Sequence, residues 1–368
     1  MTPTSLKIAF YGSSLVSAYW NGAATYYRGI IKELYKRGHH VTFYEPDAYE
    51  RQKHRDLPDP EWAKVVVYEA TEKKVLEMVQ EASKADIIIK ASGVGVFDSL
   101  LESEVLKIRN KGQSCIFWDV DAPATLQRME ENPEDPFREL VPQYDVILTY
   151  GGGQPVIDAY KVFKAKDCIP IYNALDPETH HPVGPEERFS GDLAFLGNRL
   201  PDREARVEEF FLKAATLLPE QKFLLGGSGW GDKKVPKNVH YLGHVYTKDH
   251  NALNLTPKAV LNISRESMAK MGFSPATRVF EAAGAGACLI TDNWVGIELF
   301  LEPDKEVLIA NNGDDVAKIL RELTPERAKA IGEAAKNRML TEHTYAHRAE
   351  NLENILLQLL QQVNTFSI

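Results

Sequence analysis

Short apolar segments alternate with helical segments along almost the whole chain, and this alternation limits the fold more than any other feature. The first apolar run, Leu6–Tyr11, ends at Gly12, and apolar residues then recur at helical spacing over Thr25–Arg37. Val41–Tyr44 predicts the next strand. Strand, helix and strand in succession form a βαβ unit, which joins parallel strands. The chain is therefore expected to adopt an α/β fold.

The predicted elements fall into two successive series, separated by a proline-rich stretch after Asp176. The remaining strands of the first series are predicted at Ala85–Lys90, Ser114–Trp118, Tyr144–Thr149 and Asp167–Ile171, with helices at Lys73–Ser83 and Leu101–Arg109. The second series has predicted strands at Asp192–Leu196, Phe223–Leu225, Val239–Tyr241, Ala259–Ile263, Ala287–Thr291 and Val307–Ala310, and helices at Arg203–Ala215, Arg278–Gly284, Asp314–Glu322, Thr324–Arg338 and Ala346–Val363. A chain of 368 residues is long enough for two domains.

Composition excludes several classes of protein. A net charge of -9 argues against nucleic-acid binding, which needs basic side chains on the phosphates. Three widely spaced cysteines without a CxxC pair predict neither a disulfide framework nor a zinc site. The sequence contains no apolar run of the roughly 20 residues that a membrane-spanning helix needs, and its first residues do not resemble a signal peptide. We expect a soluble, cytoplasmic protein with no membrane span.

The segment Leu261–Asp292 carries the most specific chemistry. Ser274 and Pro275 predict a helix start, because serine caps free N–H groups and proline is tolerated at the first helical position. A helix N-terminus has a partial positive charge and suits a diphosphate. Glu281 follows one to two turns later, where a carboxylate can accept hydrogen bonds from two ribose hydroxyls. Arg265, Lys270 and Arg278 can add charge-assisted bonds.

The same segment also fits a helix–turn–strand unit that binds nothing. Its residues 282–287 are all small, and small residues let a helix and the following strand pack closely. The residues alone leave both interpretations open.

Beyond these residues, the segment resembles the donor-binding core of GT-B glycosyltransferases, in which a second Glu is followed by Ala-x-x-x-Gly-x-Pro. Here that Glu is Glu281, followed by AAGAGACLITD. The text RVFEAAGAG…TD is more similar still to the CgeB-like glycosyltransferase group of spore proteins. Tyr172–Pro182 resembles the GT-B interdomain segment Asn-Gly-Val-Asp-x-x-x-Phe-x-Pro, and Arg37–Val41 resembles the Arg-Gly-His-x-Val step. The resemblance covers essentially the whole chain.

This resemblance implies two Rossmann-like domains that face each other across a cleft. The acceptor-side domain is expected at 1–172, with a C-terminal helix at about 343–368 packing back on it, and the nucleotide-sugar donor domain at 173–342. The implied activity is transfer of a sugar, such as a hexose, from a nucleotide-diphosphate sugar to a hydroxyl of an unknown small-molecule, glycan or protein acceptor.

The resemblance also implies roles for single residues. Glu281 is expected to bind the ribose, and the diphosphate is expected on Arg278 and on the backbone of Ser274, Pro275, Ala276 and Thr277. Further donor contacts are expected from Arg199, Arg265, Gly197, Gly227 and His244. Arg199 is preferred to Arg203, which fits a solvated surface charge equally well. His180 and His181, in the expected hinge, are weaker candidates to line the cleft.

One position departs from the family pattern. Seven residues before Glu281, where retaining enzymes have their first Glu, the chain has Ser274. The choice between a retaining and an inverting reaction therefore stays open.

Acceptor-side residues are expected on the loops after the strands of the first domain, because ligands of parallel sheets bind beyond the carboxyl ends of the strands. The candidates are Gly12, Ser13, Asn21, Gly22 and Gly152. Asp119, and after it Asp121, follow a buried strand and are the candidate catalytic bases for an inverting reaction. The alternative is that one of them caps the turn near Pro123.

No metal and no cofactor beyond the nucleotide-sugar co-substrate are expected. Asp119-Val120-Asp121 has the letters of an Asp-x-Asp metal motif but falls in the acceptor-side domain. Helix N–H groups and arginines can stabilise a leaving diphosphate without a metal. Two alternatives remain: a GT-B enzyme that epimerises a nucleotide-sugar at C2, and a non-catalytic nucleotide-sugar-binding protein.

Overall fold

The computed structural model describes residues 5–19 and 21–365. The chain divides into two compact units, Met1–Tyr172 with Tyr345–Ile368 (unit 1) and Asn173–Thr344 (unit 2). The sequence predicts the domain boundaries at 172/173 and at about 343. Each unit is built around its own parallel sheet.

Unit 1 contains a seven-stranded parallel sheet in the order β3-β2-β1-β4-β5-β6-β7. Its strands are β1 (Lys7–Tyr11), β2 (His40–Asp47), β3 (Lys64–Glu69), β4 (Ile87–Ala91), β5 (Ser114–Asp119), β6 (Val146–Thr149) and β7 (Cys168–Pro170). Every residue of β4, β5 and β6 is buried. Strands covered on both faces read as continuous apolar runs, which is why the sequence predicted these three well.

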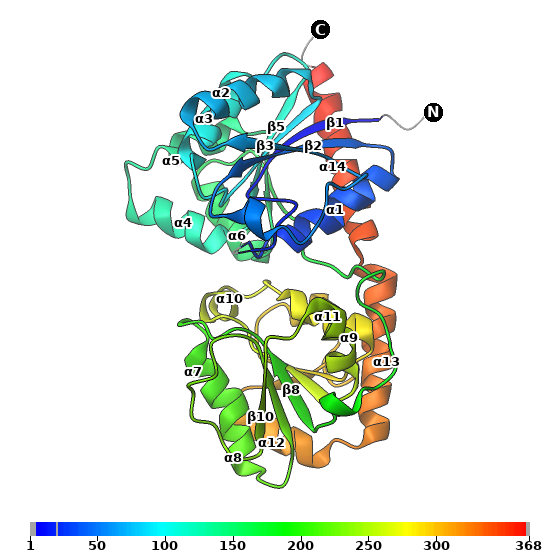
Figure 1. The fold of residues 1–368 in the computed structure, drawn as a ribbon. Coiled ribbons are helices and arrows are strands. Elements are labelled where there is room, and N and C mark those ends of the chain that lie inside the picture. Colours follow the sequence, from blue (N-terminus) through cyan, green and yellow to red (C-terminus); the bar gives the residue numbers. More distant parts are fainter. Residues whose placement is uncertain (1–4, 20, 366–368) are drawn as a thin grey trace. The chain divides into compact units, whose positions relative to one another are not determined.

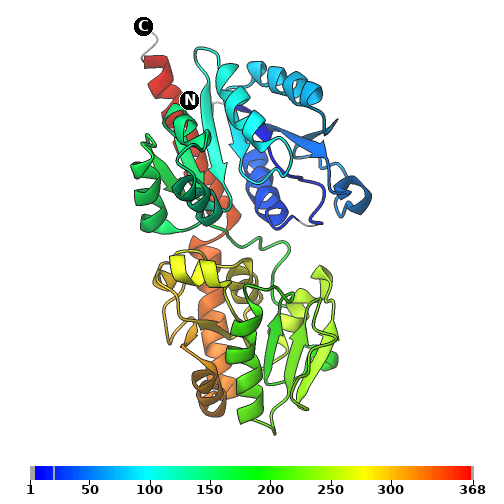
Figure 2. The same ribbon diagram turned by 90° about the vertical axis from the view of Figure 1, so that its left-hand side faces the viewer.

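Helices cover both faces of this sheet, as Figures 1 and 2 show. They are α1 (Ala24–Lys36), α2 (Glu72–Glu81), α3 (Asp98–Lys107), α4 (Ala122–Glu131), α5 (Phe137–Leu140), α6 (Gly153–Val162) and α14 (Tyr345–Thr365), with the 3₁₀ turns η1 (Arg51–His54), η2 (Ala82–Lys84) and η3 (Val141–Gln143). The last helix, α14, packs along α1 (Figure 1). The two helices approach closely at Gly29, where a side-chain Cβ would lie 2.3 Å from the ring of Tyr345.

Unit 2 contains a six-stranded parallel sheet in the order β10-β9-β8-β11-β12-β13. Its strands are β8 (Leu193–Leu196), β9 (Phe223–Gly226), β10 (Val239–Gly243), β11 (Ala259–Asn262), β12 (Leu289–Asp292) and β13 (Leu308–Ala310). Its helices are α7 (Glu204–Val207), α8 (Lys213–Leu217), α9 (Thr247–Leu255), α10 (Glu266–Met271), α11 (Thr277–Ala285), α12 (Gly313–Glu322) and α13 (Pro325–Glu342), with 3₁₀ turns η4 (Glu187–Phe189) and η6 (Ile297–Leu299). A π-helical turn, η5 (Glu208–Leu212), joins α7 to α8 within the helix predicted at Arg203–Ala215.

The two-domain α/β fold predicted from the sequence is confirmed, but several elements were missed. The sequence patterns predicted no strand at β3 and no helix at α4, α6, α9 or α10. The edge strand β3 is only half-buried, so its apolar signal stands out less than that of the central strands. In α4 a proline lies in the first turn, where it suits a helix start but hides the helix from a pattern search.

Candidate functional site

The loop before α11 differs from the predicted helix start. The helix begins at Thr277, with Ala276 as an extended N-cap residue that has no capping side chain. The hydroxyl of Ser274 donates to the carbonyl of Gly272 at 3.0 Å and caps no helix. The prediction that Ser274 and Pro275 start the helix was therefore wrong, because the Ser274 hydroxyl closes a local turn. The first N–H groups of α11 have no intrahelical acceptor, as at any helix start.

Two charged residues lie one turn apart on α11, at the end of this loop. Arg278 donates from Nη1 to Oδ1 of Asn254 at 3.1 Å, whereas its buried Nε finds no hydrogen-bond partner in the described part of the chain. Its Nη2 lies 3.8 Å from Oε2 of Glu281, and both side chains are about 15% exposed. Burial lowers the pKa of Arg278, and the Glu281 carboxylate opposes that effect. The pair therefore combines a strongly desolvated cation with a nearby anion.

Glu281 is charged but accepts no hydrogen bond from the described residues. Its Oε1 lies 3.6 Å from Nε2 of His180, and its Oε2 faces Arg278. Burial works to raise the pKa of Glu281, but Arg278, His180 and His250 together hold it below its ordinary value. A carboxylate kept ionised without protein hydrogen bonds is free to accept them from a ligand.

Two histidines extend this cluster. His180 and His250 lie with their rings 6.4 Å apart and nearly parallel, and the buried Nδ1 of each has no partner within residues 5–19 and 21–365. Nε2 of His250 lies 3.2 Å from the carbonyl of Val245. Burial and the charge of Arg278 lower the pKa of His250 to about 4. His250 is therefore neutral near pH 7.

The structure brings Arg203, rather than Arg199, into the electrostatic range of Arg278. Burial, with Arg265 and Arg278, lowers the pKa of Arg203 against the opposing effect of Asp202. The Nη2 of Arg203 donates to the carbonyl of Asn198 at 2.7 Å, and its buried Nε has no partner among the residues that the structure describes. Arg203 is therefore a better candidate for binding an anion than the sequence suggested.

Arg199 and Arg265 are both engaged in ion pairs. Arg199 contacts Glu204 at 2.8 Å and Asp232 at 3.0 Å, and Arg265 contacts Asp202 at 2.5 Å. The sequence preference for Arg199 over Arg203 did not foresee these pairs, because Asp232 lies 33 residues from Arg199 and Asp202 lies 63 residues from Arg265.

The glycines proposed near the nucleotide have a packing role of their own. A Cβ on Gly227, whose φ is +116°, would lie 2.3 Å from the carbonyl oxygen of Gly197. The loops after β8 and β9 therefore cross closely at these two glycines. His244 packs edge-on against the exposed ring of Tyr246, with 4.6 Å between ring centroids. Roles of these residues toward a ligand remain predictions.

In unit 1, Asp119 is fully buried at the end of β5. Its Oδ1 accepts from Ser92, Thr125 and the Asp121 N–H, and its Oδ2 accepts from the Tyr160 hydroxyl at 2.5 Å. Burial raises its pKa against these bonds. Asp119 is thus buried and held by four hydrogen bonds, and its role as the first candidate base stays a prediction. Asp121 is exposed and begins α4.

The expected acceptor-side residues lie on loops that are closed by their own contacts. Asn21 accepts from the Ser13 hydroxyl at 2.8 Å and donates to the Ser14 and Ser17 carbonyls. Gly12 and Gly152 are positions of close packing, where a Cβ would lie 2.5 Å from Phe43 and 2.1 Å from Val156, whereas Gly22 is open to solvent. These contacts shape the loops after β1 and β6.

The described residues include neither a metal-binding cluster nor a membrane-spanning helix. Over 5–19 and 21–365, the side chains of His, Cys, Asp and Glu form no group of three or more able to hold a metal ion. Within the same ranges, no helix combines the length and the apolar character that crossing a bilayer requires.

Comparison with known proteins supports the interpretation of unit 2. The family described as "Glycosyl transferase-like" matches residues 203–354. No curated protein matches the chain by sequence. The matched segment includes Arg203, Arg278 and Glu281.

Solved structures match the fold of nearly the whole chain. Sucrose-phosphate synthase from Thermosynechococcus elongatus has a TM-score of 0.68 at 13% identity, covering 97% of this chain and 100% of its own. HepE from Anabaena, solved with UDP-glucose, has a TM-score of 0.65 at 15% identity, covering 96% and 100%. A glycosyltransferase from Rickettsia africae has a TM-score of 0.69 at 13% identity, covering 97% and 99%.

The fold is that of the GT-B glycosyltransferases. At these identities the likeness concerns architecture, so the chemistry has to be argued from the residues of this chain. The structure brings Arg278 and Glu281, both predicted from the sequence, together with His180, and adds His250 and Asn254, which the sequence did not suggest. The only signal for His180 was its place in the Tyr172–Pro182 segment, where the family pattern has Phe.

Proposed function

We propose that the chain is a glycosyltransferase whose unit 2 binds a nucleotide-diphosphate sugar. In this proposal the N-terminus of α11, Arg278 and Arg203 bind the diphosphate, and Glu281 binds the ribose. The matching family segment, the GT-B fold and the charge pattern of these side chains support it.

One observation carries the proposal: the hydrogen-bonding capacity of Arg278 and Glu281 is only partly used by the described residues. The Nε of the cation is buried without an acceptor, and the carboxylate accepts no hydrogen bond from the described residues. Buried polar groups are nearly always hydrogen-bonded, so such a pair calls for an outside partner. A diphosphate next to a sugar with free hydroxyls provides the acceptor and the donors at once.

The proposed chemistry follows from the charges. As the bond between the anomeric carbon and the diphosphate breaks, negative charge grows on the leaving oxygen. Two desolvated arginines and the free N–H groups of a helix stabilise that charge where water is partly excluded. The proposal therefore needs no metal ion. Asp121, exposed at the start of α4, is the carboxylate in unit 1 that the proposal keeps as the base.

A uridine nucleotide is the first donor to test, because HepE, of similar fold, was solved with UDP-glucose. UDP at about 100 times its Kd should raise the free energy of unfolding by roughly 2.7 kcal/mol. That gain should appear as a rise in the melting temperature. The other common nucleoside diphosphates belong in the same screen.

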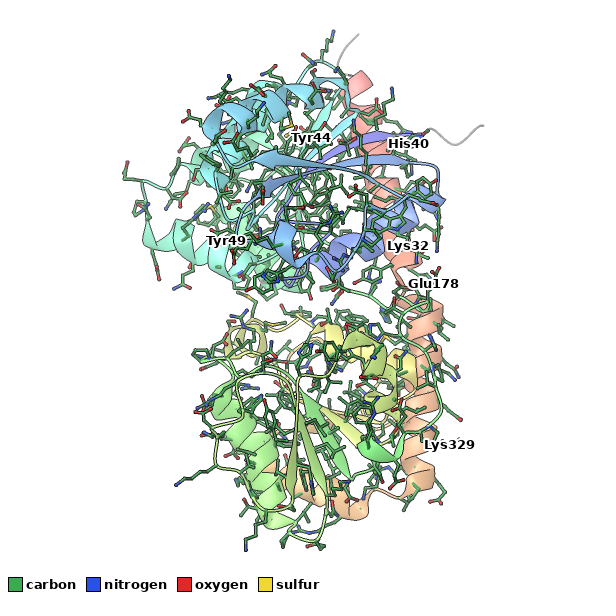
Figure 3. The ribbon with its side chains drawn as sticks, in the orientation of Figure 1. Lys32, His40, Tyr44, Tyr49, Glu178 and Lys329 are labelled. Atoms are coloured by element: carbon green, nitrogen blue, oxygen red, sulfur yellow. The ribbon has the colours of Figure 1, made fainter. Side chains whose placement is uncertain are left out.

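Arg278→Ala and Glu281→Ala should each weaken UDP binding about 10- to 100-fold, because each removes hydrogen bonds to or from a charged group. Isothermal titration of the folded variants measures the effect. Lys329→Ala is the matched charge-removal control, because Lys329 is exposed on α13 (labelled in Figure 3). This variant should bind UDP like the wild type. Unchanged affinity in the two site variants would refute the proposed site.

Catalysis is tested separately from binding. Chromatography follows the release of UDP from UDP-sugars with and without candidate acceptors. The rate of release should be lower in both site variants than in the wild type. Binding without any release or transfer would favour a non-catalytic nucleotide-sugar-binding protein.

A further inference from the structure

His180 lies on a tightly closed turn that aims it inward. Asp176 accepts the Glu178 N–H at 2.9 Å and the Thr179 hydroxyl at 3.0 Å, and its carbonyl accepts the His180 N–H at 2.9 Å. The turn can be found in Figure 3 by the label on Glu178, whose side chain is exposed. His180 itself is only 5% exposed. The turn therefore fixes where the imidazole points.

A second contact ties this turn to the helix beside α11. Asn251 on α9 donates from Nδ2 to the carbonyl of Thr179 at 3.0 Å. From the same helix, Asn254 accepts from Arg278 at 3.1 Å. The turn, α9 and α11 are thereby connected around one carboxylate, that of Glu281.

The two oxygens of Glu281 face different basic groups. Oε1 lies 3.6 Å from His180 and Oε2 lies 3.8 Å from Arg278. Both distances exceed direct hydrogen-bond length but fall within ion-pair range. Each oxygen of the carboxylate thus faces a basic side chain, at a distance that leaves its lone pairs available to a ligand.

Given the proposed function, we infer that His180 is a positioning residue. With Arg278 it holds the Glu281 carboxylate in one orientation, so that Glu281 accepts hydrogen bonds from both hydroxyls of the donor's ribose. The site thereby discriminates ribose from deoxyribose. His180 acts through Glu281 and touches no reacting atom.

The alternative is that His180 only fills space beneath α11, as a phenyl ring would. Phe stands at this position in the interdomain segment that Tyr172–Pro182 resembles. His180→Phe therefore separates the two roles: it keeps a ring of similar size and removes the nitrogen that faces Glu281.

The experiment compares UDP with 2′-deoxy-UDP by isothermal titration. The wild type should bind UDP about 10- to 100-fold more tightly, because the missing hydroxyl leaves a charged acceptor unpaired. In His180→Phe that ratio should fall to about threefold or less, while the affinity for 2′-deoxy-UDP stays within about threefold of wild type. His180→Gln, which carries an N–H group, should restore a large part of the ratio.

A pH series gives a second readout. The groups that face Glu281 are Arg278 on its own helix, His180 on the turn and His250 on α9. His180 helps to hold the pKa of Glu281 low, so UDP binding in the wild type should persist until the pH falls below the ordinary range of a carboxylate. In His180→Phe the acid loss of binding should begin at a higher pH.

Each outcome has a distinct meaning. If the wild type binds no nucleoside diphosphate, the proposed function itself fails. If the wild type binds both nucleotides equally, the contact of Glu281 with the 2′-hydroxyl fails together with the inference about His180. If the wild type shows the ratio and His180→Phe keeps it, only the inference about His180 is overturned. If His180→Phe loses affinity for UDP and 2′-deoxy-UDP equally, His180 merely supports the fold. Should this variant not fold, His180→Leu, which also lacks the nitrogen that faces Glu281, takes its place, and a ratio kept in His180→Leu overturns the inference.

Discussion

At the scale of single residues, the site in unit 2 is defined by what its polar atoms lack. Among the described residues, the buried Nε atoms of Arg203 and Arg278 have no acceptor, and Glu281 accepts no hydrogen bond. Arg199, by contrast, is held by two carboxylates. Desolvated charge without a partner costs free energy in the empty protein, and a ligand of opposite charge recovers it.

This contrast predicts opposite outcomes for two neighbouring arginines. Arg203→Ala should raise the Kd for UDP about tenfold, because it removes a charge-assisted bond to phosphate. Arg199→Ala should change it less than about twofold, since the ion pairs that it breaks are partly exposed and worth little. Isothermal titration of both variants checks the order. A larger rise in Kd for Arg199→Ala than for Arg203→Ala would instead support the preference for Arg199 derived from the sequence.

At the scale of elements, unit 1 is stabilised by close packing between the helices α1 and α14. α14 is the last helix of the chain, yet it packs along α1, the first. The contact depends on Gly29, because any Cβ there would meet the ring of Tyr345. Glycine costs helix stability by itself, so its presence in α1 is explained by this approach.

Gly29→Ala should therefore destabilise unit 1 by about 1–3 kcal/mol, the usual cost of overpacking, despite the better helix propensity of alanine. Hydrogen exchange of β1 and β5 amides in a urea series reports on unit 1 alone. Gly22→Ala is the control, because a Cβ there meets no atom within 4 Å. Equal stability of the two variants would contradict the packing argument.

The elements also show how far sequence reasoning reaches. Buried parallel strands such as β4 were predicted because every residue in them is apolar or buried, and this signal is local. The predicted start of α11 was wrong because the Ser274 hydroxyl can either accept from a helix N–H or donate to a nearby carbonyl, and only the folded loop selects the carbonyl of Gly272. The contact of His180 with Glu281 joins distant parts of the sequence, so no local pattern could reveal it.

At the scale of the whole molecule, the proposed donor site belongs to one unit. Arg203, Arg278, Glu281 and His180 all lie within Asn173–Thr344. A nucleotide without its sugar and acceptor should therefore act on unit 2 by itself.

We expect UDP to protect backbone amides of unit 2 from hydrogen exchange, above all at 176–181, 197–203 and 272–281. The loops of unit 1 around Gly12 and Asn21 should exchange at unchanged rates. Exchange followed by mass spectrometry, with and without UDP, measures this. Protection confined to unit 1 would place the nucleotide site elsewhere. The Glu281→Ala variant, which should show little protection at equal UDP concentration, is the control.

The discontinuity of unit 1 has a consequence for biosynthesis. A ribosome makes α1 early but has to translate all of unit 2 before it reaches α14. Until then the side of α1 around Gly29 has no helix to cover it, while Asn173–Thr344 already contains every strand of its own sheet. The nascent polypeptide should thus complete its second half before its first, and any premature stop before residue 345 should yield a product with an open apolar flank that chaperones and proteases recognise.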